Sequence, residues 1–107
     1  MEILKALQNW YLSQCNDSWE HRYGVKIDTL DNPGWSLKVD LTGTDLENQP
    51  FSIMKYGVDK DSHPESDNWI SCKVEENRFM GFGGPQKLEE IIQVFLTWAS
   101  ETRGQAI

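Results

Sequence analysis

Between Trp19 and Leu41 the chain carries two short runs in which apolar and polar residues alternate. The runs, 23–29 and 35–41, flank Asp31-Asn32-Pro33-Gly34, where proline presets φ for a turn and the following glycine supplies a positive φ. Alternation with period two is typical of a strand buried on one face. The pattern therefore predicts a β-hairpin with an apolar and a charged face. The apolar face would hold Val25, Ile27, Trp35, Leu37, Val39 and Leu41.

Two other segments place apolar residues at helical spacing. In 2–14 the stripe consists of Ile3, Leu4, Leu7, Trp10 and Tyr11. The second stripe consists of Leu88, Ile91, Ile92, Phe95, Trp98 and Ala99. It follows Pro85, which suits the first position of a helix. The pattern predicts an amphipathic helix near each end of the chain, with a frayed tail beyond Arg103-Gly104.

Further alternation predicts strands at 51–58, 69–75 and 78–82, with a tight reversal at Glu76-Asn77. The polar segment 59–68 is expected to be a mobile surface loop. Strands that follow one another without intervening helices favour an antiparallel meander, and both helices can cover its apolar face. We therefore expect an α+β fold in the order α-β-β-β-β-(β)-α, with four or five strands in one domain, residues 1–107.

Composition narrows the function classes. The chain has 107 residues, of which 38% are hydrophobic, and a formal charge of −7. Such a charge repels phosphate backbones and anionic lipids, so neither nucleic acid nor a membrane is an expected partner. No segment resembles a secretory leader or a membrane helix, which favours a cytoplasmic protein. Cys15 and Cys72 are the only cysteines, and we expect free thiols.

Catalytic and ligand-binding patterns are weak. His21 stands beside Glu20 and near Cys15, which could form an acid–base or nucleophile–base pair only if the fold brought them within hydrogen-bond reach. The glycine-rich segment 81–85 has no phosphate-loop spacing and is expected to be a strand-to-helix corner. The aspartates at 59 and 61 lack the glycine and terminal glutamate of a calcium loop, so neither a metal nor a cofactor is expected.

Acidic side chains interspersed with aromatics are typical of a protein interface. The predicted partner-binding residues are Trp19, Glu20, Asp28, Asp31 and Asp40. Trp19 and Trp69 could belong either to the core or to the contact surface.

Several short motifs follow one another along the chain: Leu7-Gln8-Asn9-Trp10-Tyr11, Trp19-Glu20-His21 with Tyr23-Gly24, Asp31-Asn32-Pro33-Gly34-Trp35, Asp40-Leu41-Thr42-Gly43-Thr44, the segment 69–74, and Gly81-Phe82-Gly83-Gly84-Pro85. Together and in this order they resemble the bacterial immunity protein 53 family. The resemblance implies a non-enzymatic antitoxin that binds and neutralises the cognate toxin of a polymorphic toxin system. If the toxin is a nuclease, its surface would be basic.

Two alternatives remain open at this stage. One is a small hydrolase or toxin-modifying enzyme that uses His21 with Glu20 or Cys15. The other is a structural adaptor that dimerises through the C-terminal helix. The sequence leaves the oligomeric state open.

Overall fold

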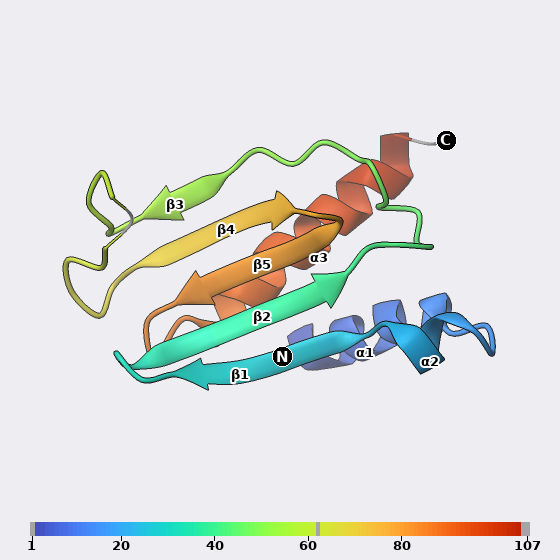
Figure 1. Cartoon of the computed structure of the whole chain (residues 1–107), viewed down its shortest axis with the longest axis horizontal. Coiled ribbons are helices and arrows are strands. Elements are labelled where there is room, and N and C mark those ends of the chain that lie inside the picture. Colours follow the sequence, from blue (N-terminus) through green and yellow to red (C-terminus); the bar gives the residue numbers. More distant parts are fainter. Residues whose placement is uncertain (1, 62, 106–107) are drawn as a thin grey trace.

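The computed structural model describes residues 2–61 and 63–105, with side chains described as far as residue 102. The elements are α1 (Ile3–Gln14), α2 (Trp19–Arg22), β1 (Val25–Leu30), β2 (Gly34–Asp40), β3 (Met54–Tyr56), β4 (Ile70–Glu75), β5 (Arg78–Gly83) and α3 (Leu88–Gln105). An open antiparallel sheet of five strands is packed by an N-terminal and a C-terminal helix (Figure 1). This confirms the predicted α+β fold. Helix α3 extends to Gln105, and the rest of the tail that was predicted to fray beyond Arg103-Gly104, residues 106–107, lies outside the described part.

The strand order is β1-β2-β5-β4-β3, so the predicted meander is wrong in one respect. Strand β5 lies between β2 and β4, and the connection 41–53 carries the chain from β2 to the far edge. This is a Greek-key arrangement of the last four strands. The deepest apolar residues of the sheet lie on β2, β4 and β5, which therefore take the centre, whereas β3 has only three residues and suits an edge.

The β1–β2 hairpin is confirmed, with Val25 opposite Val39 and Leu30 opposite Gly34. Its turn differs from the expectation, because Gly34 is the first residue of β2 and is not among the residues with positive φ. Glycine is required there for space: a Cβ on Gly34 would collide with the carbonyl oxygen of Gly83 on the neighbouring strand. The predicted reversal at Glu76-Asn77 is confirmed, since both residues have positive φ.

Both helices lie on the same side of the sheet (Figure 1). Helix α3 packs on β2, β4 and β5, and α1 packs beside α3. The core between the layers is built from the following residues: Ile3, Leu7, Trp10, Trp19, Leu37, Val39, Leu41, Leu46, Ile70, Cys72, Phe79, Ile91, Ile92, Phe95, Trp98 and Ala99. Two members of the predicted α1 stripe are exposed instead, Leu4 and Tyr11, because α1 meets the core only with the side that carries Ile3, Leu7 and Trp10.

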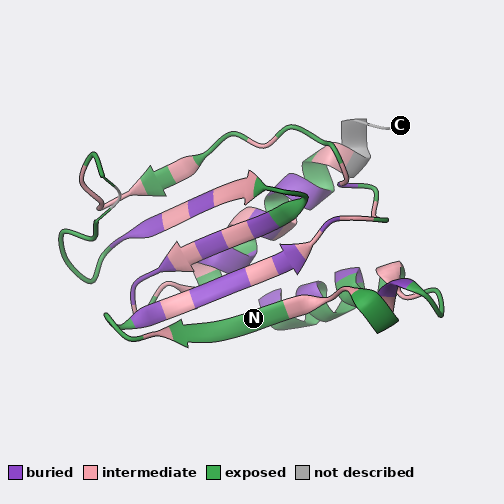
Figure 2. Ribbon diagram, viewed as in Figure 1, coloured by how far each residue is buried: buried purple, intermediate pink, exposed green. Residues whose placement is uncertain are grey.

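Strand β1 is more exposed than predicted, as its green ribbon in Figure 2 shows. Ile27 is 38% exposed although its partner Leu37 is fully buried. The reason is the placement of the helices, since α3 covers the three central strands and α1 packs on α3. The edge strand therefore has little cover on either face.

Two predicted boundaries also shift. Pro85 lies in a turn that precedes α3, and the helix begins at Leu88. The third strand is limited to Met54–Tyr56, because Phe51 leaves the ladder and packs edge-on against Phe79 and Trp98. Aromatic packing therefore holds the segment before β3 where hydrogen bonds were expected.

Candidate functional site

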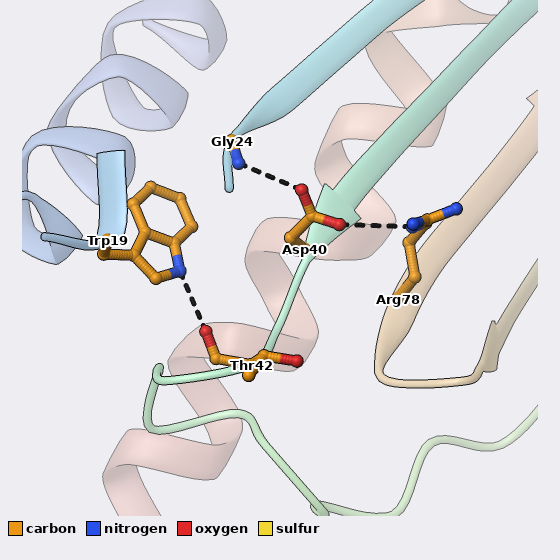
Figure 3. Close-up of polar contacts among 5 residues, drawn as sticks. All are labelled: Trp19, Gly24, Asp40, Thr42 and Arg78. Atoms are coloured by element: carbon orange, nitrogen blue, oxygen red, sulfur yellow. Dashed lines mark hydrogen bonds and ion pairs between the residues drawn. The ribbon is translucent and has the colours of Figure 1, made fainter. Parts of the chain in front are cut away.

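Asp40, at the end of β2, connects three strands (Figure 3). Its Oδ2 accepts a hydrogen bond from the backbone N–H of Gly24 at 3.0 Å, and its Oδ1 lies 3.1 Å from Nε of Arg78 on β5. The carboxylate therefore positions the start of β1 beside the end of β2. Of the five predicted partner-binding residues, Asp40 is the one whose charge is already paired within the sheet.

Trp19, on the four-residue helix α2, is only 4% exposed. Its indole N–H donates to the carbonyl oxygen of Thr42 at 2.9 Å, as Figure 3 shows. Its ring packs edge-on against Trp10 at a centroid distance of 6.1 Å and also contacts Tyr11 and Tyr23. Trp19 therefore belongs to the core and joins α1, α2 and the segment after β2.

Glu20 organises the turn between α1 and α2. Its two carboxylate oxygens accept hydrogen bonds from the backbone N–H groups of Asn16 at 2.9 Å and Asp17 at 2.8 Å. Hydrogen bonds from its own backbone N–H, from Asn16 and from Asp17 lower the pKa of this carboxyl below its usual value, with a smaller contribution from the charge of His21. The negative charge of Glu20 therefore stabilises a turn.

Asp28 and Asp31 are both exposed. Asp28 lies on the same sheet face as Asp40, whereas Asp31 lies in the hairpin turn at the opposite end of the two strands. Six residues of strand separate the hairpin ends, which corresponds to about 20 Å. The five predicted residues therefore do not form one patch: one is buried, two have structural partners and two are free at separate places.

Trp69 is 5% exposed and yet is not part of the core between sheet and helices. It precedes β4 and lies on the other sheet face, where it lines a shallow hollow of about 350 Å³ with Phe82, Ile53 and Leu30. A Cβ on Gly84 would collide with the carbonyl oxygen of Asp67, so glycine at this corner allows the two backbone segments to approach each other beside the Trp69 ring.

The candidate catalytic residues are not assembled in the described part of the chain. His21 is exposed, and no hydrogen bond joins its ring to Glu20 or Cys15. The Sγ atom of Cys15 donates to the carbonyl oxygen of Tyr11 at 3.4 Å. Cys72 is fully buried, and burial raises the pKa of its thiol to about 12. Both cysteines are free, as predicted.

The loop before β4 brings Asp59 and Asp61, whose spacing does not match a calcium loop, together with His63. Asp59, Asp61 and His63 each place one potential ligand atom within 4.8 Å of the others. The Oδ1 atom of Asp59 accepts from the backbone N–H groups of Asp61 at 2.8 Å and His63 at 2.9 Å. The bond from His63 is the largest cause that lowers the pKa of Asp59. These contacts show that Asp59 stabilises the conformation of the loop. All three side chains are exposed, so a cation bound by them would remain in contact with solvent.

Two hollows flank α3. One, of about 730 Å³, lies between α1 and α3 and is lined by Ala6, Trp10 and Leu96 among others. The second, of about 500 Å³, lies on the other side of α3 near Phe51 and Trp98.

Within residues 2–61 and 63–105, every helix is too short or too polar to span a lipid bilayer.

A family model described as immunity protein 53 matches residues 4–100. No curated protein and no solved structure matches the chain.

Proposed function

The chain belongs to the immunity protein 53 family, and on that premise we propose that it binds and neutralises a cognate toxin domain of a polymorphic toxin system in the cytoplasm of a bacterium. The observation that carries this proposal is the extent of the family match, which runs from the first turn of α1 to the last turns of α3 and so includes the whole sheet.

Neutralisation by binding is supported by the arrangement of the polar residues. Glu20 and Asp40 have their carboxylates engaged in backbone and ion-pair contacts, and within the described residues no hydrogen bond joins the His21 ring to either of them. A nucleophile and its base must lie within hydrogen-bond reach to act together. We therefore assign the chain no catalytic step and treat its surface as the active part.

The net charge of −7 supports a toxin with a positive overall charge, such as a nuclease with a phosphate-binding surface. Opposite net charges speed association over distances of about a Debye length, roughly 8 Å at physiological salt. Of the predicted contact residues, Asp28 and Asp31 remain free to take part, and Trp19 would act only from within the core.

The proposal is tested with the toxin domain encoded beside this chain's gene. Cells that express the active domain should stop growing, and co-expression of this chain should restore growth. An inactivated toxin domain should co-purify with the chain in a ratio near one to one. Loss of growth with a folded, co-expressed chain, or absence of the complex, would contradict the proposal.

The enzymatic alternative predicts a different result for His21→Ala. If the chain modified the toxin, this variant would still bind but would no longer protect. Under the binding proposal, His21→Ala protects as well as the parent chain. The adaptor alternative, dimerisation through α3, predicts that mass measured by light scattering rises with concentration in the absence of toxin.

A further inference from the structure

The sheet face away from the helices carries a charge opposite to that of the chain. Figure 1 views this face, and no helix lies in front of it. Strand register places five basic and three acidic side chains on it: Lys26, Lys38, Lys55, Lys73 and Arg78, with Asp28, Asp40 and Glu75. We call these eight residues the open sheet face. Half of the ten basic residues therefore lie here, with a net charge of +2 on a chain of net charge −7.

One row across the sheet concentrates this charge. Lys26 is directly opposite Lys38, Lys38 is opposite Met80, and Met80 is opposite Lys73. Lys73 is paired with Glu75 at 3.3 Å, whereas no ion pair within the described residues involves Lys26 or Lys38. Like charges directly opposite on neighbouring strands destabilise a sheet. The Lys26–Lys38 pair is therefore a feature that folding alone does not favour.

Two shallow hollows on this face show what kind of surface would fit. One, of about 390 Å³, is surrounded by Arg22, Lys26, Lys38 and Arg78, with Asp40 as its one acidic side chain. The other is the hollow of about 350 Å³ that Trp69, Phe82 and Ile53 line, with Lys55 and Lys73 at its edge. Ile53 is 67% exposed. The first hollow suits a carboxylate, and the second suits an apolar side chain.

We propose that the open sheet face is the docking surface for the toxin, and that it receives an acidic patch of the toxin with an apolar side chain beside the carboxylates. The inference rests on the proposed function and deepens it. Complementary charge at close range fixes register and excludes wrong partners. Net charge acts at longer range, so an acidic chain can be steered to a basic toxin and still contact it through lysines.

The decisive variant is Lys26→Glu, measured by calorimetric titration with the inactivated toxin domain. It replaces a like-charge cross-strand pair with an opposite-charge pair, so the unfolding midpoint should stay the same or rise. The dissociation constant should rise about tenfold or more. Lys5→Glu is the matched control, because it makes the same change in net charge on exposed α1 and should leave the affinity unchanged.

If net charge alone governed binding, neither variant would weaken it. Both variants make the chain more acidic, so both would associate with a basic toxin faster than the parent chain. Equal affinity of Lys26→Glu and Lys5→Glu would overturn the docking surface while leaving the proposed function intact. Absence of binding by the parent chain would remove the proposed function itself, and the docking surface with it. These two failures are thus distinguishable.

A second pair of variants tests the apolar hollow. Ile53→Asp places a carboxylate beside this hollow and should weaken binding about tenfold, since side chains that become buried near the centre of an interface contribute most of the affinity. Leu12→Asp is its control, because Leu12 on α1 is 69% exposed and lies outside the open sheet face. If the two variants weakened binding equally, the open sheet face would not be the docking surface for the toxin. The same conclusion would follow if the chain bound duplex DNA, and Lys26→Glu abolished that binding without affecting toxin binding.

Discussion

The negative charge of Asp40 is paired within the sheet and is therefore not free to contact a partner. One carboxylate oxygen accepts a hydrogen bond from the N–H of Gly24, and the other forms an ion pair with Arg78. A single residue therefore connects three strands. Sequence alone places Asp40 on the charged face of its strand, which is correct, but cannot show that a residue 38 positions away supplies its partner. Long-range pairing of this kind depends on strand order, which alternation does not encode.

The Asp40 contacts predict a moderate effect on stability. Asp40→Ala should lower the free energy of unfolding by about 1–2 kcal/mol, because the Gly24 N–H loses its acceptor. Arg78→Ala should cost less, about 0.5 kcal/mol, since that side chain is half exposed. Urea unfolding measures both. An Asp40→Ala variant as stable as the parent chain would contradict a positioning role for this carboxylate.

Cys72 and Cys15 should differ sharply in reactivity. With a pKa raised to about 12, Cys72 carries almost no thiolate at pH 8, and its side chain is fully buried. A thiol-specific reagent should therefore titrate one cysteine per folded chain and two in guanidinium chloride. Cys15→Ser should leave no reactive thiol in the folded state. Equal reaction rates for both thiols in the native protein would contradict this placement.

At the scale of elements, tryptophan N–H groups hold the connections. The indoles of Trp19, Trp35 and Trp98 donate to the backbone carbonyls of Thr42, Pro85 and Pro50, each within 3.0 Å. Each bond joins a buried or, for Trp35, half-buried ring to a segment without regular structure. The described part of the chain contains no such partner for Trp10, whose Nε1 is buried between α1 and the core.

This difference predicts unequal costs for two similar substitutions. Trp19→Phe removes a buried hydrogen bond and leaves the Thr42 carbonyl without its donor, whereas Trp10→Phe removes a donor that has no acceptor. Trp19→Phe should therefore be less stable than Trp10→Phe by about 1 kcal/mol. Urea unfolding followed by far-UV circular dichroism compares them. A larger loss for Trp10→Phe would show that ring packing outweighs the hydrogen bond.

The turn between α1 and α2 should make stability depend on acid pH. Because backbone N–H groups lower the pKa of Glu20, its carboxylate stabilises the fold above the ordinary glutamate pKa of about 4.3, and this contribution is lost as the pH falls through the lower folded-state value. Glu20→Gln should flatten the decline of the urea midpoint between pH 6 and pH 3. Parallel profiles for the two proteins would contradict this role.

Which elements form could be predicted, but how they meet could not. The helical stripes and strand alternation gave the two long helices and the hairpin, since period is a local property. The insertion of β5 between β2 and β4 depends on which strands bury each other, and Ile27 is exposed because α1 packs on α3 and leaves β1 uncovered. The sequence does not group His63 with Asp59 and Asp61, because turn geometry, which brings the three side chains together, has no periodic signal.

For the whole molecule, the distribution of charge matters more than its sum. The total of −7 conceals a basic sheet face, because acidic residues gather in the loops and on the helices while lysines line the exposed sides of the strands. The total charge alone favours an acidic contact surface, because it does not show which residues share a face. Strand register is needed to separate the two faces.

Calorimetric titration of the purified chain with the inactivated toxin domain encoded beside its gene tests whether the chain binds that toxin. We expect tight binding at a ratio near one to one, as for an inhibitor that blocks its target by contact. Heat indistinguishable from dilution at micromolar concentrations, with both proteins shown to be folded, would contradict the assignment of this chain as a toxin-neutralising protein.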